Sequence, residues 1–370
     1  MKKLIYLLPF VLLCWAYQLE AQTKNALFPI PNAQGKWGYV DANNKIVIPH
    51  KFESASPFYE ERALVAQKQA NGQVACKAIN TRGDILFEIN FLENQIDKLY
   101  HSHYHRYSNG LMNIPNYGSE SKIHQYIDKA GKIALTFTHN SANGATAHNF
   151  SEGLAYVQLT NSTLGYIDTK GKTILQSNAG DLPIEHDFQQ GWAVTTDSIG
   201  YGYTYINKKG ERATFLSKYT IQDLGSMQEG YAFMALAPKD STQQEPNFVI
   251  LQPDYSIKPI TIKLSHSTPV TYVSGYHFSN GLAYVRYMGN NDLEYDDNFG
   301  YINTSGKLAF KLPKELIPTI KGDNRDFYVT GCDFHEGLAC WAVTYPNNTT
   351  KIVYINTLGM VVLESPIFKN

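Results

Sequence analysis

The chain has 370 residues, and its 32 Lys and Arg residues nearly balance its 33 Asp and Glu residues, for a formal net charge of −1 at pH 7. This balance leaves no overall field to attract nucleic acid or an anionic membrane, so neither is expected as a partner. Charged residues make up only 18% of the chain, whereas Tyr numbers 26 and Phe 18. Aromatic residues at this frequency favour pleated strands over helices, and the composition predicts an all-β protein.

The N-terminus has the three-part layout of a secretory signal peptide. Lys2 and Lys3 precede the apolar run 4–16, which is too short to span a bilayer, and Ala21 offers the small residue that the peptidase requires. The pattern predicts a signal peptide over residues 1–21 and an exported chain that is periplasmic, secreted or displayed on the cell surface. No later apolar stretch is long enough for a transmembrane helix.

Two further features lie near this end. Cys14 raises the alternative of a lipoprotein, but Leu13 stands where a lipobox needs a small residue. Residues 22–34 follow the expected cleavage point and contain Pro29 and Pro31. Because the terminal units of a repeat array need capping, we expect this segment to be an irregular N-terminal cap or linker.

A segment with a central Tyr recurs along almost the whole chain, most clearly at Trp37-Gly38-Tyr39-Val40-Asp41. Such periods are typical of repeat proteins, in which each unit buries its apolar face against its neighbours. We therefore predict one tandem array over residues 35–370, with about seven and a half units. The aligned residues are Tyr39, Ala78, Tyr126, Tyr166, Tyr205, Val249, Tyr301 and Tyr354, and the sixth copy is degenerate.

Most copies are followed by Asp or Asn, two variable residues and Gly, as in Asp168-Thr169-Lys170-Gly171. Asp or Asn at the first position and Gly at the last fit a type I turn with a left-handed final residue, which joins two antiparallel strands. The first unit has Asn in place of Gly, and Asn tolerates positive φ better than most residues. The predicted left-handed turn positions are Asn44, Gly83, Gly131, Gly171, Gly210, Gly306 and Gly359.

A second pattern consists of an aromatic residue, one spacer, a polar residue, Gly and an alternating apolar strand, as in Phe150 to Val157. Its Gly turns the chain into a new strand. The polar residue is often Glu, at Glu60, Glu152, Glu229 and Glu336. A periodic Glu is a poor candidate for a general acid, because nothing tunes one copy differently from the others, and we expect it to accept backbone N–H groups in a turn.

These patterns together resemble the WG-containing repeat, a β repeat of exported bacterial proteins. The resemblance rests on Trp37 to Asp41, on Lys45 to Pro49, and on Phe58, Glu60 and Ala63 to Val65, and the later units keep Gly-Tyr or Tyr alone. It implies a binding or interaction scaffold and no known catalytic residue.

Two arrangements of the array are open. A propeller usually completes its first blade with its last strand, but this chain begins and ends with a Tyr-type strand, so no strand remains for such an exchange. We therefore favour an open or coiled, solenoid-like array of antiparallel β-hairpins, with a closed β-propeller-like ring as the alternative.

Candidate metal ligands occur in the longest insertions. His101, His103 and His105 alternate, and on a strand their imidazoles would share one face and could bind zinc or copper if a fourth ligand such as His124 approached. The acidic stretch 294–298 departs from the calcium-loop spacing, and a solvated loop is favoured. No cofactor is expected.

Other side chains have structural and functional interpretations. Exposed aromatic residues could stack on sugar rings, although their recurring positions favour packing for most of them. The candidates for binding are Trp37, Trp192, Tyr284 and Trp341, with Tyr231 as a further possibility. Cys332 and Cys340 are close enough in sequence to form a disulfide in an export compartment, but a free Cys also behaves as a small hydrophobic residue.

The favoured function is an exported, non-catalytic repeat scaffold that binds a protein or an envelope partner. The absence of a nucleophile elbow, phosphate loop or zinc-protease motif supports this reading. One alternative is a glycan-binding surface, suggested by the aromatic content. Another is a hydrolase with a site in the insertions at 101–107 or 292–298.

Overall fold

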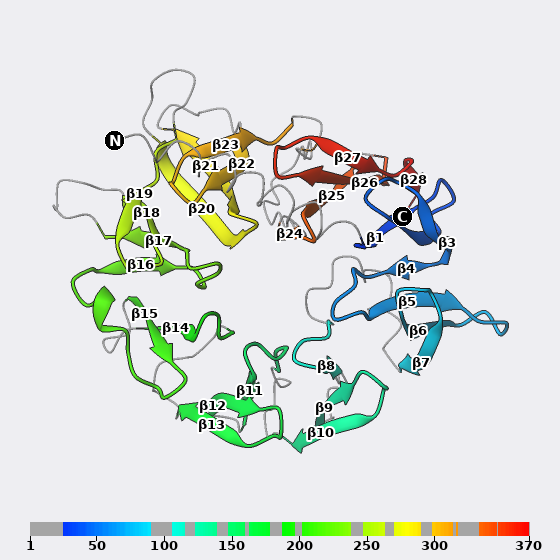
Figure 1. The fold of residues 1–370 in the computed structure, drawn as a ribbon, viewed down its shortest axis with the longest axis horizontal. Coiled ribbons are helices and arrows are strands. Elements are labelled where there is room, and N and C mark those ends of the chain that lie inside the picture. Colours follow the sequence, from blue (N-terminus) through cyan, green and yellow to red (C-terminus); the bar gives the residue numbers. More distant parts are fainter. Residues whose placement is uncertain are drawn as a thin grey trace, which may run out of the picture.

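In the computed structural model the chain forms small antiparallel sheets arranged in a ring, as in a β-propeller (Figure 1). The structure describes residues 25–89, 106–114, 123–138, 147–159, 163–177, 187–196, 202–237, 247–262, 270–289, 298–313, 316, 333–345 and 347–369. Within these residues there is no helix that is long and apolar enough to cross a membrane. The all-β prediction is confirmed, and the chain adopts the closed ring that was the alternative, in place of the favoured open array.

Eight hydrogen-bonded sheets are present in the described part of the chain, and each contains one aligned copy of the repeat. We number them in chain order. Sheet 1 contains β1 (Phe28–Pro31), β2 (Trp37–Val40) and β3 (Ile46–Phe52); sheet 2 contains β4 (Ser54–Ala55), β5 (Ala63–Lys68), β6 (Val74–Ile79) and β7 (Ile85–Ile89). Sheet 3 contains β8 (Leu111–Ile114), β9 (Ile123–Asp128) and β10 (Ile133–Thr138); sheet 4 contains β11 (Leu154–Gln158), β12 (Leu164–Asp168) and β13 (Thr173–Ser177).

The second half of the ring continues this pattern with one exception, the two-stranded sheet 5. Sheet 5 contains β14 (Trp192–Thr196) and β15 (Tyr203–Asn207), followed by the 3₁₀ helix η2 (Thr214–Leu216). Sheet 6 contains β16 (Ile221–Leu224), β17 (Ala232–Leu236), β18 (Asn247–Leu251) and β19 (Ile257–Pro259); sheet 7 contains β20 (Val270–Ser279), β21 (Leu282–Gly289), β22 (Asn298–Asn303) and β23 (Leu308–Lys311). Sheet 8 contains β24 (Phe334–His335), β25 (Leu338–Thr344), β26 (Thr349–Asn356), β27 (Val361–Glu364) and β28 (Phe368–Lys369).

The aligned residue of each copy lies on the strand that we call the central strand of its sheet. It is Tyr in six of the eight sheets, and hydroxyl groups of these tyrosines link one sheet to the next. Tyr39 donates to the carbonyl of Ser56 in the segment that opens sheet 2, at 2.8 Å. Tyr126 of sheet 3 donates to His148 O at 2.6 Å, and Tyr205 of sheet 5 donates to Gly225 O at 2.6 Å. These rings are fully buried. The Tyr is therefore retained because its ring fills the space between sheets while its hydroxyl satisfies a backbone carbonyl.

The Gly that precedes the Tyr is required for a different reason, which is the close approach of the outer strand. A Cβ atom at Gly38 would lie 2.6 Å from Ile48 O on the outer strand of the same sheet. The corresponding distances are 2.4 Å from Gly165 to Leu175 O and 2.6 Å from Gly300 to Phe310 O. Only Gly allows the outer strand to approach this closely. The Trp-Gly pair is thus a packing feature of the sheet.

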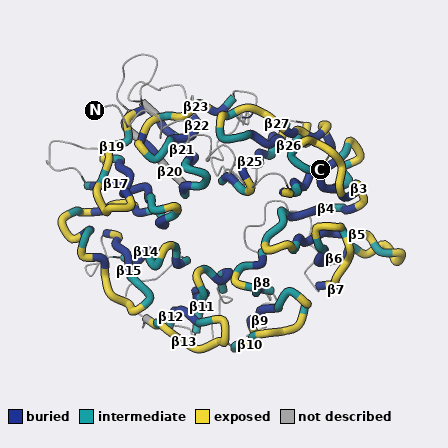
Figure 2. Tube along the Cα trace, viewed as in Figure 1, coloured by how far each residue is buried: buried dark blue, intermediate teal, exposed yellow. Residues whose placement is uncertain are grey.

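Outer strands follow the central strands and form the periphery of the ring, where Figure 2 shows many exposed residues. Each of β3, β7, β10, β13, β23 and β27 begins with a register shift against its central strand. A bulge of this kind sets two residues against one and turns apolar side chains outward. The exposed examples are Ile46, Val47, Ile85, Leu86, Ile133, Ile174, Val361 and Val362.

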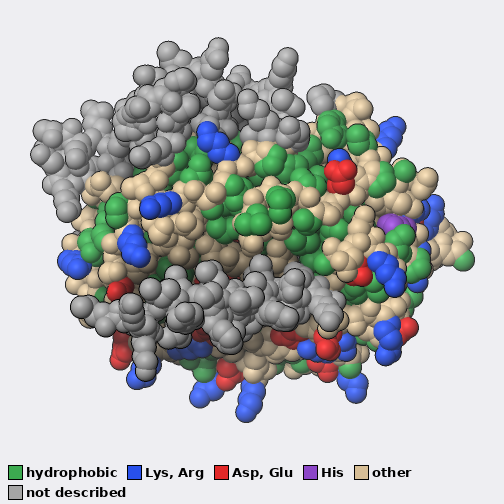
Figure 3. All heavy atoms as spheres, turned by 45° about the horizontal axis from the view of Figure 1, so that its top comes forward, with side chains coloured by type: hydrophobic (Ala, Val, Ile, Leu, Met, Phe, Trp, Pro, Cys, Tyr) green, Lys and Arg blue, Asp and Glu red, His purple; other side chains and the backbone are tan. Residues whose placement is uncertain are grey.

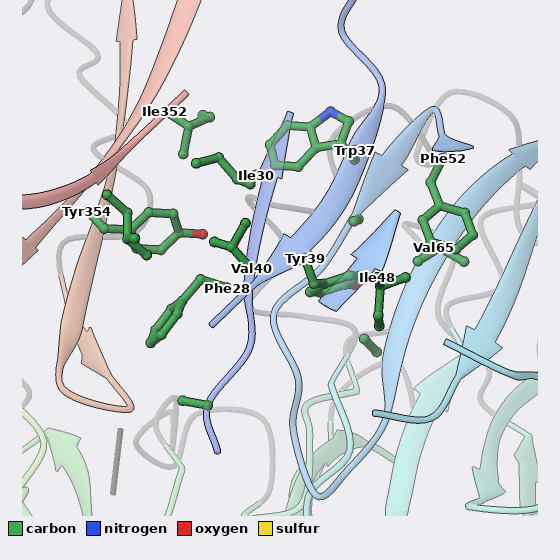
Figure 4. Packing of buried hydrophobic residues seen from close by; sticks show 14 of the residues in the cluster. Phe28, Ile30, Trp37, Tyr39, Val40, Ile48, Phe52, Val65, Ile352 and Tyr354 are labelled. Atoms are coloured by element: carbon green, nitrogen blue, oxygen red, sulfur yellow. The ribbon is translucent and has the colours of Figure 1, made fainter. Parts of the chain in front are cut away.

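The ring closes where sheet 1 packs against sheet 8, and no strand is exchanged between them among the described residues. Figure 4 shows Tyr354 and Ile352 of β26 facing Phe28, Ile30 and Val40 of sheet 1. The rings of Phe28 and Tyr354 meet edge to face with centroids 5.4 Å apart. Side-chain packing between two complete sheets therefore replaces the shared blade that was expected of a propeller.

The predicted irregular cap is wrong over its second half, since residues 28–31 form the regular strand β1. This strand is compatible with Pro29 and Pro31 because it pairs only with β2 and lies at the edge of its sheet. Asn32 donates its N–H to Lys36 O of the neighbouring segment, so the alternate positions 29 and 31 direct their nitrogen atoms away from β2. Proline is tolerated in an edge strand at such positions.

Candidate functional site

The Asp/Asn-x-x-Gly segments, and their equivalents in sheets 1 and 6, form four-residue turns at one end of every sheet. Asp168 shows the geometry: its Oδ1 accepts hydrogen bonds from Lys170 N and Lys172 N, both at 2.9 Å, and its carbonyl accepts one from Gly171 N. All the predicted left-handed positions have positive φ: Asn44 61°, Gly83 82°, Gly131 80°, Gly171 80°, Gly210 82°, Gly306 77° and Gly359 77°. In degenerate sheet 6 the turn runs from Gln252 to Tyr255, whose φ is 62°.

These turns also pack onto the preceding sheet. This packing is a second reason why Gly is required at the last position of the turn. A Cβ atom at Gly131 of sheet 3 would lie 2.6 Å from the ring of Phe87 in sheet 2. One at Gly359 of sheet 8 would lie 2.6 Å from the ring of Phe310 in sheet 7. The turn residues are thus structural, since they require both left-handed backbone and space for a neighbouring side chain.

Seven of the sheets, from sheet 2 to sheet 8, have a second turn on the inner side of the ring. It has two central residues at positive φ, as in Glu152 (51°) and Gly153 (84°), which is type I′ hairpin geometry. The polar residue bonds the next sheet: Glu152 Oε2 accepts from Gly191 N at 2.8 Å, and Glu229 Oε2 accepts from Gly281 N at 2.7 Å. The periodic Glu therefore accepts backbone N–H groups between sheets, as expected of a turn role.

Both turn types lie on one face of the ring, which we call the short-turn face. Lys208 in the Asp/Asn turn of sheet 5 contacts Glu152 in the inner turn of sheet 4, with Nζ and Oε2 3.2 Å apart. Lys129 makes the same contact with Glu60, also at 3.2 Å. Because the strands are antiparallel, the remaining connections leave from the opposite face, which we call the connection face.

The two faces differ in regularity. On the short-turn face every Asp/Asn turn has the same four-residue frame. On the connection face, the segment between the central strand and the strand that precedes it ranges from residues 345–348 in sheet 8 to residues 237–246 in sheet 6. The link from β23 to β24 spans residues 312–333. Length and sequence therefore vary on one face alone, above a frame that stays constant.

Three of the four predicted aromatic binding residues lie in the core. Trp37, Tyr284 and Trp341 are only 3%, 2% and 4% exposed. Trp37 packs edge to face on Phe368 across the closure, and Tyr284 packs on Trp341. These residues therefore cannot stack on a sugar from solution, because neighbouring sheets cover their faces.

Trp192 differs because it is only half-buried. Its ring meets Phe215 at 5.3 Å in an edge-to-face contact, and Phe215 in turn stacks on Tyr255 at 4.0 Å. A single aromatic residue whose ring is partly covered by a neighbouring side chain is a weak basis for sugar recognition. Tyr231, the further candidate, packs against Phe278.

The predicted metal ligands His101, His103 and His105 lie outside the described residues, as do Cys14, Cys332 and residues 291–297 of the acidic region. His124 is 4% exposed and stacks on Phe137 in sheet 3. Within the described ranges, no group of three His, Cys, Asp or Glu residues is arranged to hold a metal ion. The metal prediction thus remains a prediction. Cys340 is a half-buried free cysteine, as the alternative to a disulfide expected.

The structure brings together a polar cluster at the inner side of the closure that sequence reasoning missed. His335 Nε2 lies 2.9 Å from Phe58 O, and the His335 ring lies 4.5 Å from that of Tyr59. The Arg106 guanidinium lies 5.2 Å from the Tyr59 ring. Burial lowers the pKa of His335 and raises the pKa of Tyr59.

This cluster links sheet 8 directly with sheet 2, because sheet 1 has no inner turn among its described residues. No local pattern could have revealed it, since 277 residues separate His335 from Phe58. A second pair, His148 Nδ1 and Asp187 Oδ1 at 3.1 Å, joins sheets 4 and 5. The pair therefore links two neighbouring sheets.

Residues 37–69 match the model of the family described as WG containing repeat, so the resemblance seen in the first unit is confirmed there. None of the curated proteins with which the sequence was compared matches it. Among solved structures, the computationally designed Ika8 protein is similar at 10% identity and a TM-score of 0.42, over 83% of this chain and 84% of that one.

Two natural proteins have a similar arrangement. BamB from Moraxella catarrhalis matches at 11% identity and a TM-score of 0.38, over 84% of this chain and 86% of that one. The β-propeller domain of the Trilobed protease from Pyrococcus furiosus, described as having an open velcro topology, matches at 8% identity and a TM-score of 0.38, over 75% and 93%. At these values the similarities carry no information about activity or partner.

Proposed function

We propose that the protein is an exported, non-catalytic scaffold that binds a protein partner through its connection face. The observation that carries this proposal is the asymmetry of the ring. Interlocking turns with constant frames occupy the short-turn face, whereas all connections of variable length leave from the other face. Loops on a rigid frame are where binding specificity usually resides.

The frame supports this role because contacts between neighbouring sheets repeat around it. The central tyrosines, the glycines of the Asp/Asn turns and the Glu residues of the inner turns each join one sheet to the next. A ring held in this way keeps the strand ends at fixed positions, so a partner meets a preorganised surface. The burial of Trp37, Tyr284 and Trp341 gives no support to the glycan-binding alternative.

The test is capture of a partner from the native envelope with purified protein. We expect a specific partner to be lost when connection 290–297 or 238–246 is replaced by a Gly-Ser segment of equal length. The matched controls are Lys170→Ala and Lys209→Ala, which change exposed side chains on the short-turn face. Capture that survives both replacements, or that fails in the controls, would contradict the proposal.

Export and lack of catalysis need separate tests. N-terminal sequencing of the mature protein should begin at Gln22 if the signal peptide is removed after Ala21. A hydrolase screen should show no activity, and any activity that disappears in His103→Ala or Asp297→Ala would favour a site in the insertions.

A further inference from the structure

Sheet 5 lacks the outer strand that its neighbours have. In sheet 4 the outer strand β13 pairs with the central strand β12 from Ile167 back to Leu164. In sheet 5 the central strand β15 pairs with β14, and on its other side the described part of the chain makes only one isolated bridge, Ile206 to Arg212. The chain therefore begins an outer strand in this sheet but does not continue it.

The chain leaves that position after Ala213. Ala213 N donates to Tyr205 O at 2.9 Å, as an outer strand would, but the next residues form the 3₁₀ helix η2. Leu216 at the end of η2 is 2% exposed and belongs to the hydrophobic core between sheets 5 and 6. The burial of Leu216 thus accompanies the departure of the chain from the edge of β15.

The consequence is a free backbone edge at Tyr203. Asn207 N bonds Glu211 O and Tyr205 O accepts from Ala213 N, so residues 203, 205 and 207 direct their backbone groups to the outer side. Among the described residues, neither the N–H nor the C=O of Tyr203 has a partner on that side. The Tyr203 side chain is 39% exposed.

This edge also has a cation at its end. Arg212 is exposed, and its Nη1 donates to Thr196 O at 2.5 Å. Thr196 is the residue of β14 that lies opposite Tyr203. The bond therefore holds the guanidinium at the end of the sheet at which Tyr203 lies, and the guanidinium makes no ion pair within the described part of the chain. A guanidinium with further N–H donors is suited to a carboxylate.

Other sheet edges in the ring are not equivalent. In sheets 1 to 4 and 6 to 8 the central strand is paired on both sides. The exposed apolar residues of the outer strands in sheets 1, 3 and 4 are preceded by lysines, at Lys45, Lys132 and Lys172, and charged residues of this kind discourage pairing at an edge. Figure 3 shows hydrophobic side chains on one side of the molecule interspersed with Lys, Arg, Asp and Glu.

We propose that the edge of β15 accepts an extended segment of a partner protein as an added strand. The segment takes the place of the missing outer strand, exchanges backbone hydrogen bonds with Tyr203, and places an acidic side chain at Arg212. Main-chain pairing gives such complexes their affinity, and the side chains at the edge select the sequence. This inference does not depend on the connection face being the main binding surface.

The test uses a peptide with the sequence of residues 360–365, Met-Val-Val-Leu-Glu-Ser, which covers the outer strand of sheet 8 and contains an acidic residue. We expect a fluorescently labelled, capped peptide to bind the full protein saturably in anisotropy measurements. Tyr203→Pro removes the outward N–H without removing a bond to β14, and Arg212→Glu reverses the charge. Each should weaken binding by about tenfold or more.

Two peptides methylated on alternate backbone nitrogens provide the matched control, because only one side of an added strand faces β15. One should bind like the parent peptide and the other should not bind. Equal binding of both, or no binding of the parent peptide at millimolar concentration, would overturn the proposal. Arg212→Glu decides the outcome if Tyr203→Pro does not fold.

Two further measurements exclude other occupants of the edge. Hydrogen exchange in the free protein should leave the Tyr203 amide unprotected, and strong protection would mean that the chain itself fills the edge. Size-exclusion chromatography with light scattering should show no dimer that Tyr203→Pro dissociates. Such a dimer would replace the partner strand by a second copy of the chain and would also overturn the proposal.

Discussion

Tyr354 donates its hydroxyl hydrogen to the carbonyl oxygen of Pro29 at 2.7 Å, although 325 residues separate the two. Both residues are buried, and the bond joins the last sheet to the first. It matches the bond from Tyr39 to Ser56 O, which joins sheet 1 to sheet 2. The closure thus uses the same contact as a junction between consecutive sheets, so the ring closes without a shared strand.

Replacing Tyr354 by Phe should destabilise the protein by about 1–3 kcal/mol, because the Pro29 carbonyl would remain buried without its donor. Urea unfolding at neutral pH measures the loss. Tyr203→Phe is the control, since its side chain is 39% exposed. That change should stay within about 0.5 kcal/mol. An equal effect of both substitutions would mean that the bond contributes nothing to closure.

Substitutions of three glycines by Ala should separate the cost of a left-handed backbone from that of a close neighbour. Gly153, Gly171 and Gly131 all have φ between 80° and 84°. A Cβ atom meets nothing within 4 Å at Gly153, lies 3.4 Å from Leu135 at Gly171, and lies 2.6 Å from Phe87 at Gly131.

Gly153→Ala should therefore cost about 1 kcal/mol, from the backbone alone. Gly131→Ala should cost about 2–4 kcal/mol, because the Phe87 ring must also move, and Gly171→Ala should lie between them. Thermal or urea unfolding gives the order. Equal losses at the three positions would show that the turns do not press on the preceding sheet.

The repeated unit was predictable from sequence because its determinants are local. Asp168 and Gly171 specify their turn within four residues, and Glu152 follows from a pattern that recurs at the same place in each unit. The strand β1 was missed because Pro29 and Pro31 argue against a strand unless it lies at an edge, and the edge position is set by the tertiary fold.

The closure of the ring could not be predicted from local patterns, because it depends on packing between residues far apart in the sequence. Counting strands favoured an open array, but Phe28 and Tyr354 close the ring through side chains, which a strand count does not register. Trp37 and Trp341 were predicted as binding residues because of their residue type. Whether they are exposed depends on which sheets face each other, and both are buried. The cluster of Tyr59, Arg106 and His335 likewise cannot be predicted unless the closed arrangement of the sheets is known.

The pH dependence of stability should contain a contribution from His335. Burial lowers its pKa below the usual 6.5, so between the two values the unfolded chain binds more protons than the folded one. Stability should then fall as the pH decreases below about 6.5 and level off below the folded pKa. The neighbouring Arg106 acts in the same direction, whereas Glu336 and the bond to Phe58 O oppose it.

The measurement for His335 is urea unfolding between pH 7.5 and 5.5. His335→Gln keeps an N–H donor for Phe58 O but does not titrate, so its free energy of unfolding should decline less than that of the wild type. His50 also has a pKa lowered by burial and contributes equally to both proteins. An identical decline in the two proteins would place the titrating group elsewhere.

The Asp/Asn choice in the turns should produce a second, more acidic dependence. Hydrogen bonds from the N–H groups of Lys172 and Lys170 hold the pKa of Asp168 below its usual value of 3.8. The carboxylate therefore stabilises the fold above about pH 4, and this contribution is lost as the pH falls through the folded pKa. Asp168→Asn keeps the turn, because Asn occupies this position at Asn80 and Asn207. Urea unfolding from pH 6 to 2.5 should show the two proteins converging in stability at low pH, whereas a constant difference would mean that the charge of Asp168 is not what the turn uses.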